Sequence, residues 1–528
     1  MSPDTLINQN ILMNSQPVSS ASLKPVFWYV VTGVIAVAVW CHFIDPVINP
    51  DGVKYVLAGE AMVRGQFQTG LQAYKWPAYS VSIALVSYVS QLSVESSALV
   101  FNVVMRIAAG LAFLNLVRKF GADQRQLRLA ALIFVLYPGL NEVQSMIIRD
   151  FAYLACFMWM IVFFVQQISN PTRRNFLGFV FMGLLAAAYR IEGFVYLVGL
   201  FIVYLLWGTV SLPWKKTGLI LVLLILPLMS YGVLFWIYNG DVSNAWNQLS
   251  LTFAQSSENL DLYITSLDNK TWSMLVDKLS LPILLLMPVV ILLGNLIEVV
   301  SIGYVLILVG GWICRPLIDK RQTSNLLMID AWKWIIGINL LVLIGFVLVR
   351  QIVTDRYPLS LALMLMLFTP FALTAIWDRV SCWSPGYRRW FIGLAFFLLF
   401  ANTLEGLDRV SSKGHMKEAG IWISEQTGGY DKNRVYSNVP IVDYYSGKPV
   451  VEPDDHYRAY VVNSLVLTSR WKLLHFMAIS LDADTKPGFY RNFRYRIGKE
   501  PERIFENHKG DKVLVYDFRD EKDKKYRY

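Results

Sequence analysis

Residues 26–44, VFWYVVTGVIAVAVWCHFI, are followed at once by residues 45–79, DPVINPDGVKYVLAGEAMVRGQFQTGLQAYKWPAY. The first stretch is apolar and, at about 1.5 Å of helical rise per residue, long enough to cross the hydrocarbon core of a bilayer. The second stretch is polar and carries carboxylates, basic residues and aromatic rings. A carboxylate held at a membrane surface usually has a function. The junction therefore predicts a membrane-spanning helix that leads into a chemically active loop.

The composition extends this interpretation to the whole chain. The 528 residues are 55% hydrophobic and only 16% charged, which excludes an ordinary soluble globular protein. The formal net charge of +10 comes from basic residues that cluster in short segments between apolar runs. Such clusters mark the cytoplasmic ends of membrane spans. They therefore indicate topology and give no reason to expect a nucleic acid partner.

Apolar runs of span length recur along the chain and predict a mainly α, polytopic membrane protein with about 11 transmembrane helices. Basic clusters follow alternate runs, which places the tail 1–25 in the cytoplasm and the first outer loop, 45–96, outside. The first run lacks a basic n-region and a small-residue cleavage site, so we expect it to remain as a signal anchor. The expected spans within the transmembrane domain 26–407 are 26–44, 97–117, 128–142, 151–168, 175–190, 193–209, 217–238, 292–313, 332–350, 358–377 and 389–405.

The apolar stretch 76–95 is not counted as a span. Counting it would turn the next basic cluster outward and would place the acidic candidates discussed below on opposite faces of the membrane. We therefore expect a helix that lies in the interface, with Trp76 and Tyr79 as aromatic anchors. A second interfacial helix is expected at 273–290.

The carboxyl-terminal region 408–528 changes character, because it is charged and punctuated by Gly and Pro. We interpret it as a separate small α/β domain on the extracytoplasmic face. Its histidines show no HxxH or HExxH spacing, and the four cysteines of the chain lie in or beside apolar runs, so no metal site and no disulfide framework is predicted. Within this region we expect a helix at 417–425 and strands at 434–439, 448–453 and 512–518.

The first outer loop supplies three candidate positions. Asp51, in NPDGVKY, is either the cap of a helix that begins after it or a catalytic carboxylate, and the two roles can coexist. Tyr55 follows one helical turn later. Lys75 precedes Trp76 and Pro77, where it either snorkels to lipid headgroups or binds a substrate phosphate.

Three later motifs end at the same face: IRD, YRIEG and DRYP. The Arg-Asp step of the first suits a helix start, where the pair can simply neutralise itself. A charge at mid-depth costs about 2.5–3.5 kcal/mol, so the charged pair of the second is expected in a wet cavity. The arginine of the third can hold a phosphate through two parallel hydrogen bonds. The candidates in these motifs are Arg149, Asp150, Arg190, Glu192, Arg356 and Tyr357.

The combination suits group transfer from an anionic leaving group. A carboxylate orients or deprotonates the acceptor, and cations stabilise the charge that develops on a phosphate. The inference rests on convergence at one face of the membrane, because each motif taken alone has a structural explanation.

Five segments, in this order, carry a resemblance to a known family: DGVKYVLAGEAMVRGQF, KWPAYSVSIAL, YPGLNEVQSMIIRDFAYLACF, YRIEG and DRYPLSLAL. Together they resemble the membrane glycosyltransferases of the GT-C superfamily, with the protein O-mannosyltransferases and lipid A aminoarabinose transferases as the nearest pattern. The match is good over about 26–200 and is mainly architectural beyond. In that pattern an acidic residue is followed four positions later by Tyr, and a Pro-containing element starts the next helix.

The resemblance implies a polyprenyl-phosphate-linked sugar donor and transfer on the outer face with inversion, by direct displacement. It implies Asp51 as the catalytic carboxylate and Asp150 as the second acidic residue. Lys75 stands where the family has His or Glu, and Arg356 matches the family's basic residue loosely. The motif PDG lacks the second acid of a DxD pair, so no cofactor is expected. A divalent metal stays an open alternative that the motif does not support, and positive side chains are able to replace it.

The full hypothesis is a glycosyltransferase of the bacterial cytoplasmic (inner) membrane, surrounded by membrane lipids, that glycosylates a glycan, lipid or protein acceptor. The substrate-binding set comprises Tyr55, Lys75, Trp76, Arg149, Arg190, Glu192, Arg356 and Tyr357. Two alternatives remain open. A flippase for a lipid-linked saccharide would use the same cations and an apolar groove, although transporters more often show repeated halves. A non-enzymatic receptor or assembly factor would be built around the outer domain.

Overall fold

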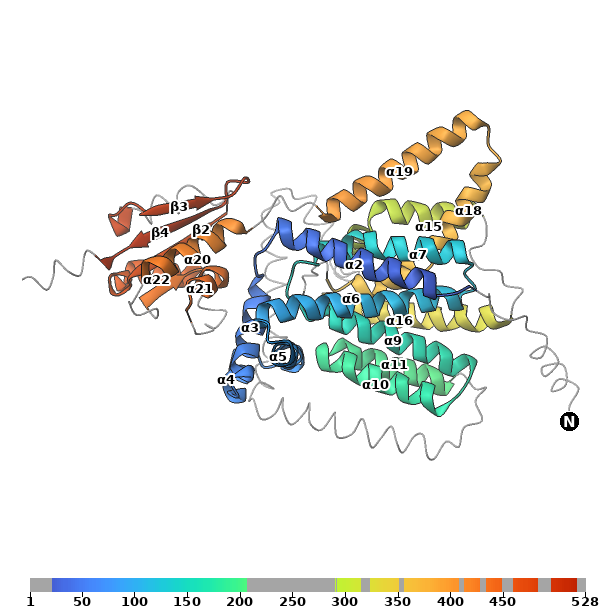
Figure 1. The fold of residues 1–528 in the computed structure, drawn as a ribbon, viewed down its shortest axis with the longest axis horizontal. Coiled ribbons are helices and arrows are strands. Elements are labelled where there is room, and N and C mark those ends of the chain that lie inside the picture. Colours follow the sequence, from blue (N-terminus) through green and yellow to red (C-terminus); the bar gives the residue numbers. More distant parts are fainter. Residues whose placement is uncertain are drawn as a thin grey trace, which may run out of the picture.

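The computed structural model describes residues 21–206, 290, 292–314, 323–350, 356–407, 413–427, 434–448, 459–482 and 495–519. Figure 1 shows a bundle of long helices, a group of short helices at one end of it, and a small α/β unit beyond them. The predicted span 217–238, the segment 239–280 that follows it and, but for residue 290, the predicted helix 273–290 lie outside the described residues.

Four described helical segments are long and apolar enough to cross a membrane: Lys24–Ile44 (α2), Val94–Lys119 (α6), Asp150–Ser169 (α9) and Leu359–Ser381. A fifth crossing is present if the helices Leu292–Val300 and Ile302–Cys314 (α15) count together. The chain is an integral membrane protein. The number eleven stays a prediction.

Three of the predicted spans are interrupted: 292–313, 128–142 and 358–377. The span 292–313 is not one helix, because its halves are bent by 89° at Ser301, which has a φ of 70°. The span 128–142 divides into α7 (Gln124–Leu136) and α8 (Pro138–Glu142). The residue before a proline is driven out of the helical region, so the second break has a local cause.

The remaining long helices overlap their predicted ranges. They are α10 (Arg173–Tyr189), α11 (Glu192–Leu206), α16 (Thr323–Arg350) and α19 (Pro385–Leu407). Helix α16 begins well before the predicted span 332–350. The segment Leu359–Ser381 comprises α17 (Leu359–Met366) and α18 (Thr369–Ser381).

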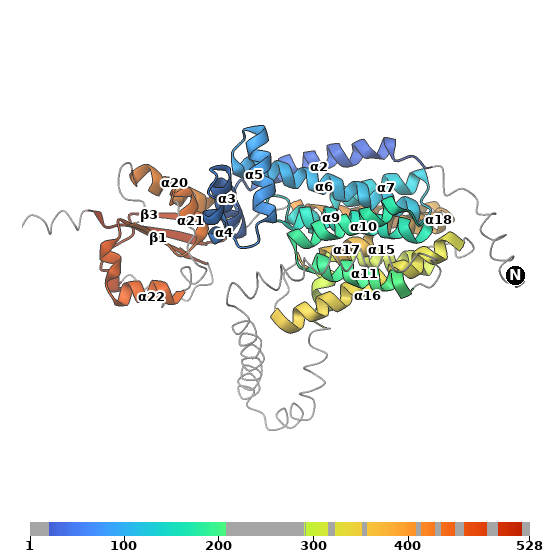
Figure 2. The same cartoon turned by 90° about the horizontal axis from the view of Figure 1, so that it is seen from below.

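The first outer loop forms three short helices, α3 (Pro50–Val63), α4 (Phe67–Ala73) and α5 (Ala78–Ser90). In Figure 1 α5 is seen end-on while α2 and α6 lie lengthwise, and in Figure 2 it stands across them. A helix perpendicular to the spans is the orientation expected of an interfacial helix. The role given to Tyr79 was wrong, however, because its ring is fully buried and its hydroxyl donates to Asn102 Oδ1 at 2.9 Å.

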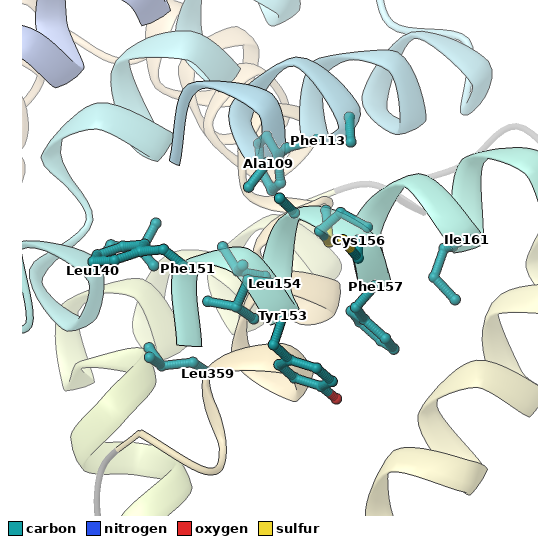
Figure 3. Packing of buried hydrophobic residues seen from close by; sticks show 14 of the residues in the cluster. Ala109, Phe113, Leu140, Phe151, Tyr153, Leu154, Cys156, Phe157, Ile161 and Leu359 are labelled. Atoms are coloured by element: carbon teal, nitrogen blue, oxygen red, sulfur yellow. The ribbon is translucent and has the colours of Figure 1, made fainter. Parts of the chain in front are cut away.

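Helix α9 lies deep in the bundle. It buries 78% of its most apolar stretch, compared with 83% for Leu359–Ser381 and 22% for α2. Figure 3 shows its side chains, among them Phe151 and Phe157, within one cluster that also includes Leu140 of α8 and Leu359 of α17. In lipid such packing is driven by van der Waals contact rather than by exclusion of water, which favours close helix approach. Gly110 of α6 serves this approach, since a Cβ there would lie 2.7 Å from Phe134 Cε1.

The described part of the carboxyl-terminal region contains a four-stranded sheet in the order β1-β2-β4-β3. Strand β1 (Val435–Ser437) is parallel to β2 (Phe476–Leu481), while β4 (Lys512–Asp517) is antiparallel to both β2 and β3 (Arg503–Glu506). The helices of this unit are α20 (Gly414–Thr427), α21 (Pro440–Tyr445) and α22 (Ala459–Leu467). We refer to the described residues from 413 to 519 as the C-terminal unit.

The predicted helix 417–425 and strands 434–439 and 512–518 correspond to α20, β1 and β4. The predicted strand 448–453 lies, apart from residue 448, outside the described residues. The C-terminal unit stands next to α3 at one end of the bundle, which brings it to the same end as the first outer loop (Figure 1).

Candidate active site

A pocket of about 270 Å³ lies at the end of the bundle that carries α3. Its lining is almost entirely polar and includes four cations, two carboxylates and three tyrosines. The residues that line it are Asp51, Lys54, Tyr55, Tyr74, Arg149, Asp150, Arg190, Arg356 and Tyr357. Segments separated by 305 residues therefore meet at one site, as the bond between Asp51 and Arg356 shows.

One face of α3 forms one wall of the pocket. Asn49 is the N-cap residue and Pro50 begins the helix, so Asp51 lies in the first turn rather than at the cap. Lys54 and Tyr55 follow at i+3 and i+4, the spacing that brings side chains to one face of a helix. Helix capping therefore does not explain Asp51.

The carboxylate of Asp51 is bound by an arginine from the far end of the sequence. Nη1 and Nη2 of Arg356 both donate to Oδ2 of Asp51 at 3.1 Å, and no hydrogen bond to Oδ1 is formed among the described residues. The Asp51 side chain remains 45% exposed. Burial acts to lower the pKa of Arg356, but Asp150 and Asp51 outweigh it and raise that pKa, so the guanidinium stays charged.

Tyrosines line the wall beside Asp51. The Tyr55 ring packs edge-on against Tyr74, at 4.7 Å between centroids, and against Tyr79 at 5.0 Å. Burial raises the pKa of the Tyr55 phenol well above its ordinary value, against the opposing effect of Arg149. Its hydroxyl therefore stays protonated at neutral pH and is able to donate a hydrogen bond.

The second carboxylate belongs to a buried ionic network. Arg190, at the end of α10, forms ion pairs with Asp150 and with Glu192, the latter at 2.7 Å between Nη2 and Oε1. The exposed fractions of these three side chains are 6%, 7% and 15%. The Tyr357 ring lies 4.4 Å from the guanidinium of Arg190, which is cation–π geometry.

Arg149 differs from the other arginines of the pocket. It occupies the N-cap position of α9, and its guanidinium lies 6.0 Å from the Tyr74 ring centroid. Among the described residues it forms no ion pair. It is therefore the pocket arginine whose charge is least neutralised by neighbouring carboxylates.

The structure brings most of the sequence-predicted candidates together. Glu192 lies behind the lining as a partner of Arg190, whereas Lys75 is exposed and does not line the pocket. Trp76 is also outside the lining, and its indole N–H donates to the carbonyl oxygen of Ala188. Sequence reasoning missed Lys54 and Tyr74, although the i+3 spacing from Asp51 was a usable signal for Lys54.

No group of three or more His, Cys, Asp or Glu residues in the described ranges is arranged to hold a metal ion. Both carboxylates of the pocket are instead bound by arginines.

Comparison with known proteins identifies the architecture. One matching solved structure is the oligosaccharyltransferase of Archaeoglobus fulgidus tethered through a disulfide bond to an acceptor peptide containing the NVT sequon. The TM-score is 0.50 at 12% sequence identity, and the match covers 92% of this chain and 73% of that chain. The chain has the GT-C glycosyltransferase fold. The resemblance noted in the sequence is thus confirmed at the level of the fold.

A second similar structure is ArnT from Cupriavidus metallidurans bound to undecaprenyl phosphate. Its TM-score is 0.41 at 12% identity, over 94% of this chain and 98% of that chain. No family model matches the sequence, and no curated protein matches it.

Proposed function

We propose that this protein is a glycosyltransferase that moves a sugar from a polyprenyl-phosphate donor to an acceptor hydroxyl. The observation that carries the proposal is the composition of one pocket, in which a half-exposed carboxylate, Asp51, lies with Arg149, a cation that forms no ion pair among the described residues. A carboxylate and a cation are the two groups that displacement of a phosphate requires. The GT-C fold supports the same class of reaction.

The reaction is a single displacement at the anomeric carbon. The acceptor hydroxyl donates a hydrogen bond to Asp51 and attacks the anomeric carbon from the face opposite the phosphate. The new bond from acceptor oxygen to carbon forms as the bond from carbon to phosphate oxygen breaks, the proton passes to Asp51, and the electron pair leaves with the lipid phosphate. The configuration inverts, and the transition state resembles an oxocarbenium ion.

The surroundings of the three arginines give each of them a different role in the proposed reaction. Arg149 binds the departing phosphate together with Lys54, which lines the same pocket. Arg190 is engaged by two carboxylates and so positions Asp150 rather than the phosphate. Arg356 holds the carboxylate of Asp51 from Oδ2, so that Oδ1 is available to the acceptor. The tyrosine rings are suited to stacking on a sugar.

We place this site on the extracytoplasmic side of a bacterial inner membrane. Asp150 begins α9 and Arg190 follows α10 at the pocket, so the Arg173–Arg174 step at the start of α10 lies at the opposite end of the bundle. Arg118 and Lys119 end α6, which begins beside the C-terminal unit. Basic residues gather on the cytoplasmic side of spans. The lipid part of the donor lies among the spans, and the acceptor is a glycan, a lipid or a protein.

The deciding experiment is transfer of radiolabelled sugar from a panel of polyprenyl phosphate sugars to membrane extract. Asp51→Asn keeps the shape of the side chain but removes its basicity, so we expect the rate to fall about 1,000-fold. Asp378→Asn is the matched control. Asp378 lies on α18, is exposed, pairs with Arg125 of α7 and does not line the pocket. We expect it to transfer at the wild-type rate.

A flippase would give a different result. If neither wild type nor Asp51→Asn transfers sugar, while both move lipid-linked sugar across proteoliposomes equally well, the catalytic proposal fails. A receptor or assembly factor predicts neither activity.

A further inference from the structure

The C-terminal unit contacts the chain just before α3, the helix that carries Asp51. Lys417 Nζ donates to the carbonyl oxygen of Pro46 at 2.8 Å, and the N–H of Ile48 donates to the hydroxyl of Tyr445 at 3.2 Å. Both bonds are made to the backbone of residues 46–48, which lead directly into α3 and Asp51.

The same segment is held from its other side. Asn49 Oδ1 accepts from the N–H of Ile147 at 2.8 Å, in the turn that leads to Arg149. Gly52 permits this approach, since a Cβ at that position would lie 2.9 Å from Ile147 Cβ. The backbone before Asp51 is therefore clamped between the C-terminal unit and the segment that carries the phosphate-binding arginine.

Tyr445 is itself firmly placed. A Cβ on Gly420 of α20 would lie 2.6 Å from Tyr445 Cβ, so only glycine allows α20 to come this close to α21. Lys417, one turn earlier on α20, places Nζ 5.1 Å from the centroid of the Tyr445 ring, within cation–π range. Tyr444 and Tyr445 both pack against the core of the transmembrane bundle.

We propose that the C-terminal unit is a positioning element of the active site, acting through Lys417 and Tyr445 on residues 46–48. This rests on the proposed function. A domain that only covered the bundle would not need hydrogen bonds to the backbone that sets the position of Asp51. The precision matters, because a displacement of about 1 Å in a reacting group lowers a rate by up to about 100-fold.

The test uses two neighbouring tyrosines. Tyr445→Phe removes the hydroxyl that accepts from Ile48 but keeps the ring over Lys417. Tyr444→Phe is the matched control, because its hydroxyl bonds to Glu95 Oε2 on α6 at 3.1 Å, a side chain that Tyr445 also faces, and forms no hydrogen bond to residues 46–48 among the described residues. For Tyr445→Phe in the full-length protein we expect kcat to fall about tenfold with the donor KM within about twofold, and for the control no more than about a twofold change. Equal rates for the two variants overturn the proposal.

Lys417→Met provides a second, independent variant. Its control is Lys472→Met, since Lys472 belongs to the same unit but lies over Trp471 instead. We expect the first substitution to lower kcat several-fold and the second to leave it unchanged. To separate positioning from loss of folded protein, the stoichiometry of undecaprenyl phosphate binding is measured in parallel. A fall in kcat that matches a fall in stoichiometry overturns the proposal.

Hydrogen exchange of the Ile48 amide separates this inference from the proposed function. Suppose that the protein transfers no sugar, yet the Ile48 amide exchanges faster in Tyr445→Phe and not in Tyr444→Phe. The proposed anchoring is then supported and the proposed glycosyltransferase activity is refuted. If the Ile48 amide exchanges at the same rate in Tyr445→Phe as in wild type, the proposed anchoring is refuted, whatever the transfer activity.

Discussion

Asp51 and Asp150 are the same residue type in the same position, the first turn of a helix, yet their surroundings differ. Asp51 is 45% exposed and pairs with Arg356, which is 27% exposed. Asp150 is 7% exposed and pairs with Arg190, which is 6% exposed and also binds Glu192. Both carboxylates line one pocket.

The difference in burial suits the two carboxylates to different roles. A partly exposed ion pair is screened by water and contributes little to stability, so it exchanges partners readily. A buried pair has lost its hydration, and neither partner is easily released. Asp51 is thus suited to meeting a substrate, and Asp150 to fixing the geometry of the wall.

The largest effect expected from this contrast is on folding. Arg190→Met leaves the carboxylates of Asp150 and Glu192 buried without their cation, which costs about 3–5 kcal/mol. Thermal unfolding of the purified protein in detergent measures the loss. The comparison is Arg356→Met, which exposes Asp51 to water and is expected to cost no more than about 1 kcal/mol. Similar losses in the two variants would break the distinction drawn between the pairs.

The next effect concerns substrate rather than stability. Arg149→Gln removes the pocket arginine that has no carboxylate partner among the described residues, and a hydrogen bond to a charged group is worth about 1.5–3 kcal/mol. We expect the donor KM to rise about 10- to 100-fold without a change in unfolding temperature.

Lys75→Gln is the control for Arg149, because Lys75 is exposed and outside the pocket. Its KM is expected to equal that of wild type in the same assay. A large rise for Lys75→Gln would restore the phosphate-binding role that the sequence suggested for this residue.

A smaller effect is expected at the boundary between the two pairs. Tyr357 lines the pocket and its ring also lies over Arg190, so it joins the buried ionic network to the pocket. Tyr357→Leu removes the cation–π contact and is expected to destabilise the protein by about 1 kcal/mol, while Tyr357→Phe retains most of it. Thermal unfolding of the two variants decides; equal destabilisation would assign the effect to the hydroxyl.

The features that were predictable from sequence are those with a local signal. Span length follows from bilayer thickness, and the acidic motif after the first span pointed to the site. The bend at Ser301 was missed because no proline or glycine stands at that position. Strand β3 was missed because three of its four residues are exposed, so it shows little hydrophobic alternation.

Long-range partnership lay beyond the sequence. Nothing near Asp51 indicates that Arg356 binds it or that Tyr445 anchors the backbone before it, since both arise from packing across the whole chain. Lys75 shows the converse: its neighbours made it a plausible phosphate ligand, and the direction of the chain after α4 turns it to solvent.

The smallest effect expected is that of removing divalent metal. Where a metal bridges a donor phosphate, carboxylates must be available as ligands. Here Asp51 and Asp150 are both occupied by arginines, and the pocket already holds four cationic side chains. Transfer is therefore expected to continue within about twofold of its normal rate in excess EDTA, because the cations supply the charge stabilisation. If EDTA abolishes transfer and Mn²⁺ or Mg²⁺ restores it, the pair between Asp51 and Arg356 must open to admit the metal, and Asp51 would become its ligand rather than the base. Arg356→Met would then lower the metal concentration needed for half-maximal transfer instead of lowering the rate directly. This result would separate the role of Asp51 as a metal ligand from its role as a base.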